Sequence, residues 1–162
     1  MELYLMQHGA CFSKEVNPEQ PLSPVGREWV EKSARAMAYL GLTMDHMVCS
    51  TKLRSFETAE VVAEQLRFPV SAIKETDTAK PMAPPHSLLQ FLGALPAKSR
   101  VFVAGHLPSL NEFTSLVITN GSKAAVNFEN AGLMRLDVLD FKRPAGSLIW
   151  YIPPSLLHLL HR

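Results

Sequence analysis

The feature that most constrains this chain is a short apolar run near its start that ends in Gln7-His8-Gly9. The run covers residues 3–6, and a nearly continuous apolar stretch of this length predicts a strand buried on both faces. In an open α/β sheet, ligands bind at the carboxyl ends of such strands. The sequence therefore predicts that a buried strand carries His8 to the ligand-binding edge, where Gly9 has no Cβ to keep a phosphate from the backbone.

The size and charge of the chain predict how many domains it has and which classes of partner it lacks. Its 162 residues, 47% of them hydrophobic, are enough for one good core, so we expect a single domain over 1–162. Sixteen Lys and Arg against fifteen Asp and Glu leave a net charge of +1, and like charges form no run. We therefore expect neither a nucleic-acid nor a membrane partner, and a monomer is the default expectation.

The chain is also expected to be cytoplasmic. Glu2 stands where a signal peptide would carry a basic residue, and no apolar segment is long enough to span a membrane. Cys11 and Cys49 are far apart in sequence and lack the spacing of a metal site. In a chain of this size they are expected to be reduced thiols.

The chain continues with the first of several predicted helices. Ser23 is a suitable N-cap, Pro24 suits a first turn, and Gly41 is placed to end the helix. Apolar residues recur between them at helical spacing, which predicts that Val25 and Trp29 belong to a buried stripe.

A second strand is predicted at 46–49, and it leads almost directly into a helix over 52–67 with Thr51 as a plausible cap. A strand that feeds a helix through so short a loop is typical of βα units. This connection puts Arg54 in the first turn of the helix, at the same edge of the sheet as His8, where free backbone N–H groups already favour an anion.

A third strand is predicted at 69–73, followed by a proline-rich loop at 74–85 over the site edge. The run 100–104 predicts another buried strand, and it ends in Gly105-His106, with Pro108 in the first turn of a helix. The remaining predicted elements are a helix at 87–95, an end to the Pro108 helix at Asn120-Gly121, strands at 131–138 and 147–152, and an amphipathic tail at 155–162.

Three of these residues, His8, Arg54 and His106, are predicted to meet at one edge of the sheet. Phosphoryl transfer needs an in-line nucleophile and fixed positive donors around the phosphoryl oxygens. A neutral imidazole can attack phosphorus and hold the group as a phosphoramidate. His8 is the predicted nucleophile, Arg54 offers a planar fork to two oxygens, and His106, if protonated, adds a second charged donor.

The order and spacing of the motifs resemble those of the histidine phosphatase superfamily. The small size of the chain is similar to that of the SixA-type branch, the phosphohistidine phosphatases. The resemblance covers about residues 1–120 and is carried by Gln7-His8-Gly9, Pro21-Leu22-Ser23 with Gly26, Ser50 through Arg54 with Glu57-Thr58-Ala59, and Gly105-His106-Leu107-Pro108.

The resemblance implies a phosphoglycerate-mutase-like fold, a three-layer α/β/α sandwich around a mainly parallel sheet. It implies a covalent phosphohistidine intermediate on His8 and phosphate contacts from Arg54 and His106. Gln7 and Gly9, which flank His8, are the other predicted phosphate contacts. It implies no metal or organic cofactor. The implied partners are a phosphorylated protein of the histidine phosphotransfer type or a small phosphorylated compound.

The chain departs from the family pattern at Gln7, because the family motif there reads Arg-His-Gly. An amide donor carries no charge, so the transition state loses stabilisation on the order of 1–3 kcal/mol unless another cation compensates. The candidate cations are Lys14, Arg27, Lys52 and Lys80. A weak or inactive phosphate-binding module therefore stays open as an alternative function.

The leaving group bears on the substrate. Ester hydrolysis needs a general acid, and Glu75 and Asp77 are the acidic residues of the loop where the larger family members carry one. Imidazole is a good leaving group and needs less help, so the sequence favours a phosphohistidine substrate. A small-molecule phosphomonoesterase that uses Glu75 or Asp77 as its acid is the other alternative.

Overall fold

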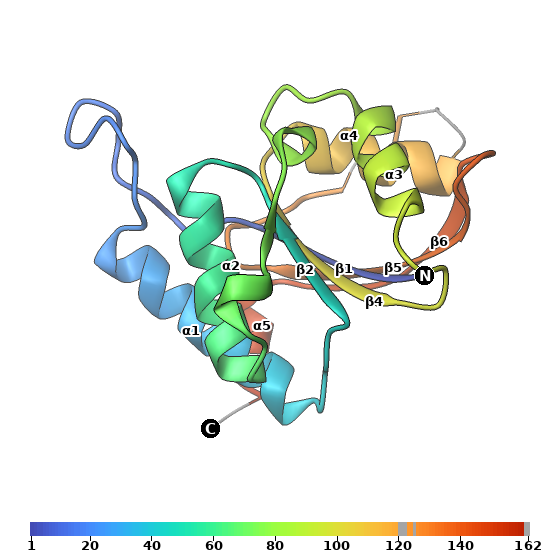
Figure 1. Cartoon of the computed structure of the whole chain (residues 1–162). Helices are drawn as coiled ribbons and strands as arrows, with labels where there is room; N and C mark the ends of the chain where they lie inside the picture. The colour runs from blue at the N-terminus through green and yellow to red at the C-terminus, as the bar shows by residue number, and fades with distance from the viewer. Residues whose placement is uncertain (120–122, 125, 161–162) are drawn as a thin grey trace.

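A computed structural model gives the fold, and it describes residues 1–119, 123–124 and 126–160. Six strands form one sheet in the order β3-β2-β4-β1-β5-β6. The first four strands in this order are parallel, and β5 and β6 are antiparallel additions beside β1. Helices cover both faces of the sheet (Figure 1). The predicted three-layer α/β/α architecture with a mainly parallel sheet is confirmed.

The bounds of the elements follow the sequence patterns closely in most places. The strands are β1 (Glu2–Gln7), β2 (His46–Cys49), β3 (Lys74–Glu75), β4 (Arg100–Gly105), β5 (Leu133–Asp140) and β6 (Ala145–Ile152). The helices are α1 (Pro24–Tyr39), α2 (Leu53–Leu66), α3 (Pro85–Gly93), α4 (Ser109–Thr119) and α5 (Pro154–Leu157), with short 3₁₀ turns η1 (Val70–Ala72) and η2 (Asp77–Ala79).

The core is divided by the sheet into two apolar clusters. Along β1, Tyr4 and Met6 pack on the side of α1, α2 and α5, whereas Leu3 and Leu5 pack on the side of α3 and α4. This alternation is that of a strand buried on both faces. If the same alternation continues past the end of β1, His8 faces α2, the helix that carries Arg54.

The start of α1 is as predicted, and its predicted buried stripe (Val25, Trp29, Val30, Ala34, Met37 and Ala38) is confirmed at Val30, Ala34 and Met37 but is wrong at the other three positions. Ser23 Oγ accepts from the backbone N–H of Gly26 at 3.0 Å, and Pro24 opens the helix. Val25 and Trp29, however, are 58% and 41% exposed. The buried side of α1 instead carries small residues and Val30 and Met37, because the helix lies close against the sheet and α2.

Two further local predictions are wrong. Thr51 does not cap α2; the N-cap is Lys52, and Thr51 Oγ1 donates to Asp77 Oδ1 at 2.8 Å. The segment 69–73 is not a strand, because η1 occupies it and the parallel ladder with β2 begins only at Lys74.

The predicted helix end at Asn120-Gly121 lies outside the described residues. So do the last two positions of the predicted 155–162 tail. Within the described ranges, no helix is both long enough and apolar enough to cross a lipid bilayer.

Candidate active site

His8 follows directly from β1, and its backbone N–H continues the ladder by donating to Gly105 O at 3.0 Å. Its Nδ1 lies 2.7 Å from the carbonyl oxygen of Gly9. Because a carbonyl only accepts, Nδ1 carries the hydrogen and Nε2 keeps its lone pair. Burial lowers the pKa of His8 to about 4, and the charge of Arg54 acts in the same direction. At neutral pH the ring is therefore an uncharged base with Nε2 available as nucleophile.

Arg54 meets this nitrogen from the first turn of α2. Its Nε donates to His8 Nε2 at 3.1 Å, and one terminal nitrogen donates to Gln20 Oε1 at 3.3 Å. The lone pair on His8 Nε2 thus accepts a hydrogen bond from the guanidinium. A phosphoryl group that reacts at Nε2 must take over the Arg54 donors for its own oxygens, which a planar fork can provide.

His106 comes from the loop after β4 and is 1% exposed. Its ring lies beside that of His8, with centroids 4.7 Å apart, and its Nε2 is 2.6 Å from Ser50 Oγ. Burial, together with smaller effects of the neighbouring His8, Arg54 and Lys52, lowers the pKa of His106 to about 3. The free site therefore holds a neutral His106, not the charged donor that protonation would make it.

Thr58 ties the histidine loop to α2. Its Oγ1 accepts from the Gly9 N–H at 3.0 Å and donates to Arg54 O at 2.7 Å. A Cβ on Gly9 would lie 2.6 Å from Val30 Cγ2 and 2.9 Å from Gly26 O. Gly9 is therefore required by close packing on α1, and its N–H is already bonded. The predicted reason for this glycine, room for phosphate at its backbone, is replaced by this packing.

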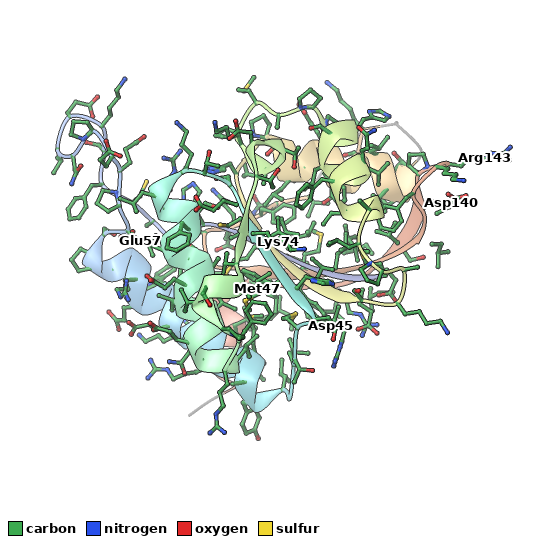
Figure 2. The ribbon with its side chains drawn as sticks, viewed as in Figure 1. Asp45, Met47, Glu57, Lys74, Asp140 and Arg143 are labelled. Carbon is green, nitrogen blue, oxygen red and sulfur yellow. The ribbon has the colours of Figure 1, made fainter. Side chains whose placement is uncertain are left out.

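Residues that sequence reasoning missed complete the site. Asn130 Nδ2 donates to His8 O at 2.5 Å, and Gln20, at a positive φ of 50°, holds Arg54. Glu57, which belongs to the motif named from the sequence, uses its Oε2 to accept from Leu22 N at 2.6 Å, on the side of α2 that faces the N-terminal loop (Figure 2). A polar residue in a loop gives no sequence signal for such long-range contacts.

The predicted phosphate contact Gln7 lies half-buried at the end of β1, beside Gly105 of β4. In the part of the chain that the structure describes, no hydrogen-bond partner is found for its side-chain amide. By strand alternation it lies on the face of Leu3 and Leu5, the side of α4.

The four candidate cations differ in their positions. Arg27 pairs with Glu31 on α1, Lys80 Nζ pairs with Asp77 Oδ1 at 2.7 Å, and Lys14 is exposed in the loop before α1. Lys52 stands at the start of α2, and its charge reaches His106. It borders a hollow of about 620 Å³ that is otherwise lined mainly by the proline-rich segment 81–84 and its neighbours.

The two candidate acids are exposed at the same rim. Asp77 accepts from Thr51 and pairs with Lys80, and these contacts lower the pKa of its carboxyl group. These contacts therefore favour the ionised form of Asp77, which has no proton to donate. Glu75 ends β3 and borders a smaller hollow with Leu53. Among the described side chains, no three His, Cys, Asp or Glu gather closely enough to hold a metal ion.

Comparisons with known proteins agree with this architecture. No family model matches the chain. An uncharacterized protein of Picosynechococcus sp. is 26% identical, with 84% of each chain covered. The solved structure of the protein histidine phosphatase SixA complexed with tungstate superposes with a TM-score of 0.84 at 20% identity, covering 96% of this chain and 98% of that one.

Two further solved structures show the same likeness. A protein of Agrobacterium tumefaciens assigned as phosphohistidine phosphatase SixA has a TM-score of 0.74 at 20% identity, covering 94% of this chain and 97% of its own. A protein of Escherichia coli assigned as an alpha-ribazole-5'-P phosphatase has a TM-score of 0.74 at 14% identity, with 96% and 98% covered. The chain therefore has the phosphoglycerate-mutase-like fold that SixA and these phosphatases share.

Proposed function

We propose that this protein is a histidine-dependent phosphatase that removes phosphate from phosphohistidine, through a covalent intermediate on His8. The observation that carries the proposal is the hydrogen-bonding state of His8. Its Nδ1–H is fixed on Gly9 O at 2.7 Å, which leaves Nε2 unprotonated and beside the guanidinium of Arg54. The fold shared with SixA, described as a protein histidine phosphatase, supports the same reaction class.

In the proposed first step, His8 Nε2 attacks phosphorus and the bond from phosphorus to the leaving nitrogen breaks. Arg54 shifts its donors from Nε2 to the phosphoryl oxygens, where negative charge is concentrated. The substrate reacts with a proton already on its other ring nitrogen, so its imidazole leaves as a neutral ring and needs no acid. In the second step, water attacks the phosphorus on His8, which frees inorganic phosphate and restores the neutral ring.

The acidic residues support a phosphoramidate over an ester as substrate. An alkoxide leaving group needs a general acid, and Asp77 is held ionised by Lys80 and Thr51. Glu75 is exposed at the end of β3. A phosphohistidine substrate avoids this requirement, because imidazole leaves readily. The proposal covers a phosphohistidine on a phosphotransfer protein and a phosphohistidine in a small compound.

The test is a time course of phosphate release by the wild type and His8→Ala, from a phosphohistidine-bearing protein and from an aryl phosphate. We expect release by the wild type alone, faster from phosphohistidine. Full activity of His8→Ala would refute the mechanism. Tight calorimetric binding of the phosphorylated protein without release would identify a phosphate-binding module instead. Ester hydrolysis that is lost on replacing Glu75 and Asp77 together would identify a phosphomonoesterase.

A further inference from the structure

The second histidine of the site is held by a serine. Ser50 follows β2 directly, is inaccessible to solvent, and places its Oγ 2.6 Å from His106 Nε2. The backbone N–H of Lys52 donates to the same Oγ at 3.3 Å. Ser50 thus links the start of α2, the helix of Arg54, to the ring that faces His8.

The positions of the hydrogens follow from these partners. A serine hydroxyl has one hydrogen to donate, and the Lys52 N–H is itself a donor, so it cannot accept that hydrogen. Ser50 is inaccessible to solvent, so bulk water does not take the hydrogen either. The acceptor that is left in the described part of the chain is His106 Nε2. The neutral ring therefore carries its own hydrogen on Nδ1.

That Nδ1 atom is buried and has no hydrogen-bond partner in the described protein. A buried donor without an acceptor destabilises a folded protein, and native structures keep few of them. Its ring stands 4.7 Å from the His8 ring, centroid to centroid, and close enough to Arg54 for its charge to be felt. An oxygen of a phosphoryl group beside the His8 ring would be an acceptor for this Nδ1–H donor.

We infer that Ser50 is a positioning residue that locks His106 in the Nδ1–H tautomer, so that Nδ1–H donates to the phosphoryl group transferred to His8. This inference rests on the proposed function and specifies how a neutral His106 takes part in it. A neutral donor suits a site in which the nearby guanidinium already supplies positive charge.

The test is NMR of the full chain with nitrogen-labelled histidines, with His106→Gln used to assign the ring signals of His106. In the wild type we expect a protonated Nδ1 and an unprotonated Nε2, and a shift of the Nδ1–H signal on addition of inorganic phosphate. Ser50→Ala should give mixed tautomers and lower kcat/KM by roughly tenfold or more. Ser50→Thr, which keeps the hydroxyl, should restore both.

Ser109→Ala is the matched control. Ser109 is also buried, but its hydroxyl donates to the backbone oxygen of His106 at 2.9 Å and not to the ring. It should leave the tautomer unchanged. A wild type protonated on Nε2, or a Ser50→Ala protein with the wild-type tautomer, would overturn the inference. So would a Nδ1–H signal that phosphate does not move.

The two proposals fail in different ways. If the tautomer and the phosphate response are as expected but the wild type releases no phosphate, Ser50 sets the tautomer and Nδ1–H contacts phosphate, but the proposed function and the transfer to His8 are wrong. If the wild type turns over with Nε2 protonated, the proposed function stands and the role of Ser50 is wrong. The wild-type spectrum alone decides the tautomer if Ser50→Ala does not fold.

Discussion

Replacing Gln7 by arginine is predicted to accelerate the proposed phosphatase reaction. Gln7 is half-buried at the end of β1, directly before His8, and its amide is unbonded within the described chain. Its strand neighbour is Gly105, which precedes His106. The backbone of residue 7 is therefore adjacent to the residues that carry both rings, although its side chain starts on the opposite face of the sheet. With His8 and His106 neutral at neutral pH, Arg54 is the cation in direct contact with the nucleophile.

The size of the effect follows from the charge of the donor. A hydrogen bond from a charged group contributes about 1.5–3 kcal/mol, against about 0.5–1.5 kcal/mol for a neutral one, and charge accumulates on the phosphoryl oxygens in the transition state. A gain on the order of 1–3 kcal/mol corresponds to roughly a ten- to hundredfold rise in kcat/KM. Gln7→Met, which is of similar size but donates no hydrogen bond, should lose activity by a smaller factor.

The assay is the initial rate of phosphate release from a phosphohistidine-bearing protein by the wild type, Gln7→Arg and Gln7→Met. Urea unfolding of each variant checks that the fold is intact. If Gln7→Arg is folded and no faster than the wild type, residue 7 does not reach the transferred group. If Gln7→Met is as fast as the wild type while Gln7→Arg is faster, the native amide makes no contact and only an added charge does.

Three further predictions concern the surroundings of the site. Lys52→Ala should lower kcat/KM roughly three- to tenfold at low salt, because the charge of Lys52 reaches His106. Lys98 is exposed before β4, so the control variant Lys98→Ala should leave kcat/KM unchanged. Equal effects of the two variants would refute a local role for Lys52. Thr58→Val should lower the free energy of unfolding by about 1–3 kcal/mol in urea titrations, because the buried Gly9 N–H loses its acceptor; an unchanged stability would contradict this. His8 should titrate by NMR with a midpoint near pH 4, so that its nucleophilic lone pair persists well below the ordinary histidine pKa of 6.5 and is lost only as the pH falls further. A midpoint near 6.5 would show that the ring is not desolvated.

The sequence was sufficient to predict the residues that lie at the sheet edge. His8 and His106 each follow a buried strand directly, and Arg54 lies in the first turn after another, so parallel topology brings the three together. Apolar runs and the Ser23 cap are local signals, and the elements that depend on them are where they were predicted, except for the strand predicted at 69–73.

The contacts that support these residues could not be predicted in the same way. Asn130 is 122 positions from His8 in sequence, and Ser50 is 56 from His106. Such pairs form only when distant loops meet, and a lone polar residue gives no signal of its partner. The exposure of Trp29 has a similar cause, since helical periodicity alone does not fix which side of α1 faces the sheet.

The charges of the site also connect the choice of substrate to the effect of Gln7. An added arginine would act on the phosphoryl oxygens, which are the same in a phosphoramidate and in an ester. In the proposed mechanism the preference for phosphohistidine is instead set by the leaving group, because Lys80 and Thr51 favour the ionised form of Asp77, which has no proton to donate. Gln7→Arg should therefore raise both rates by a similar factor and leave their ratio unchanged. A ratio that moves toward the ester would mean that residue 7 also acts on the leaving group, and the separation of roles argued for this site would be wrong.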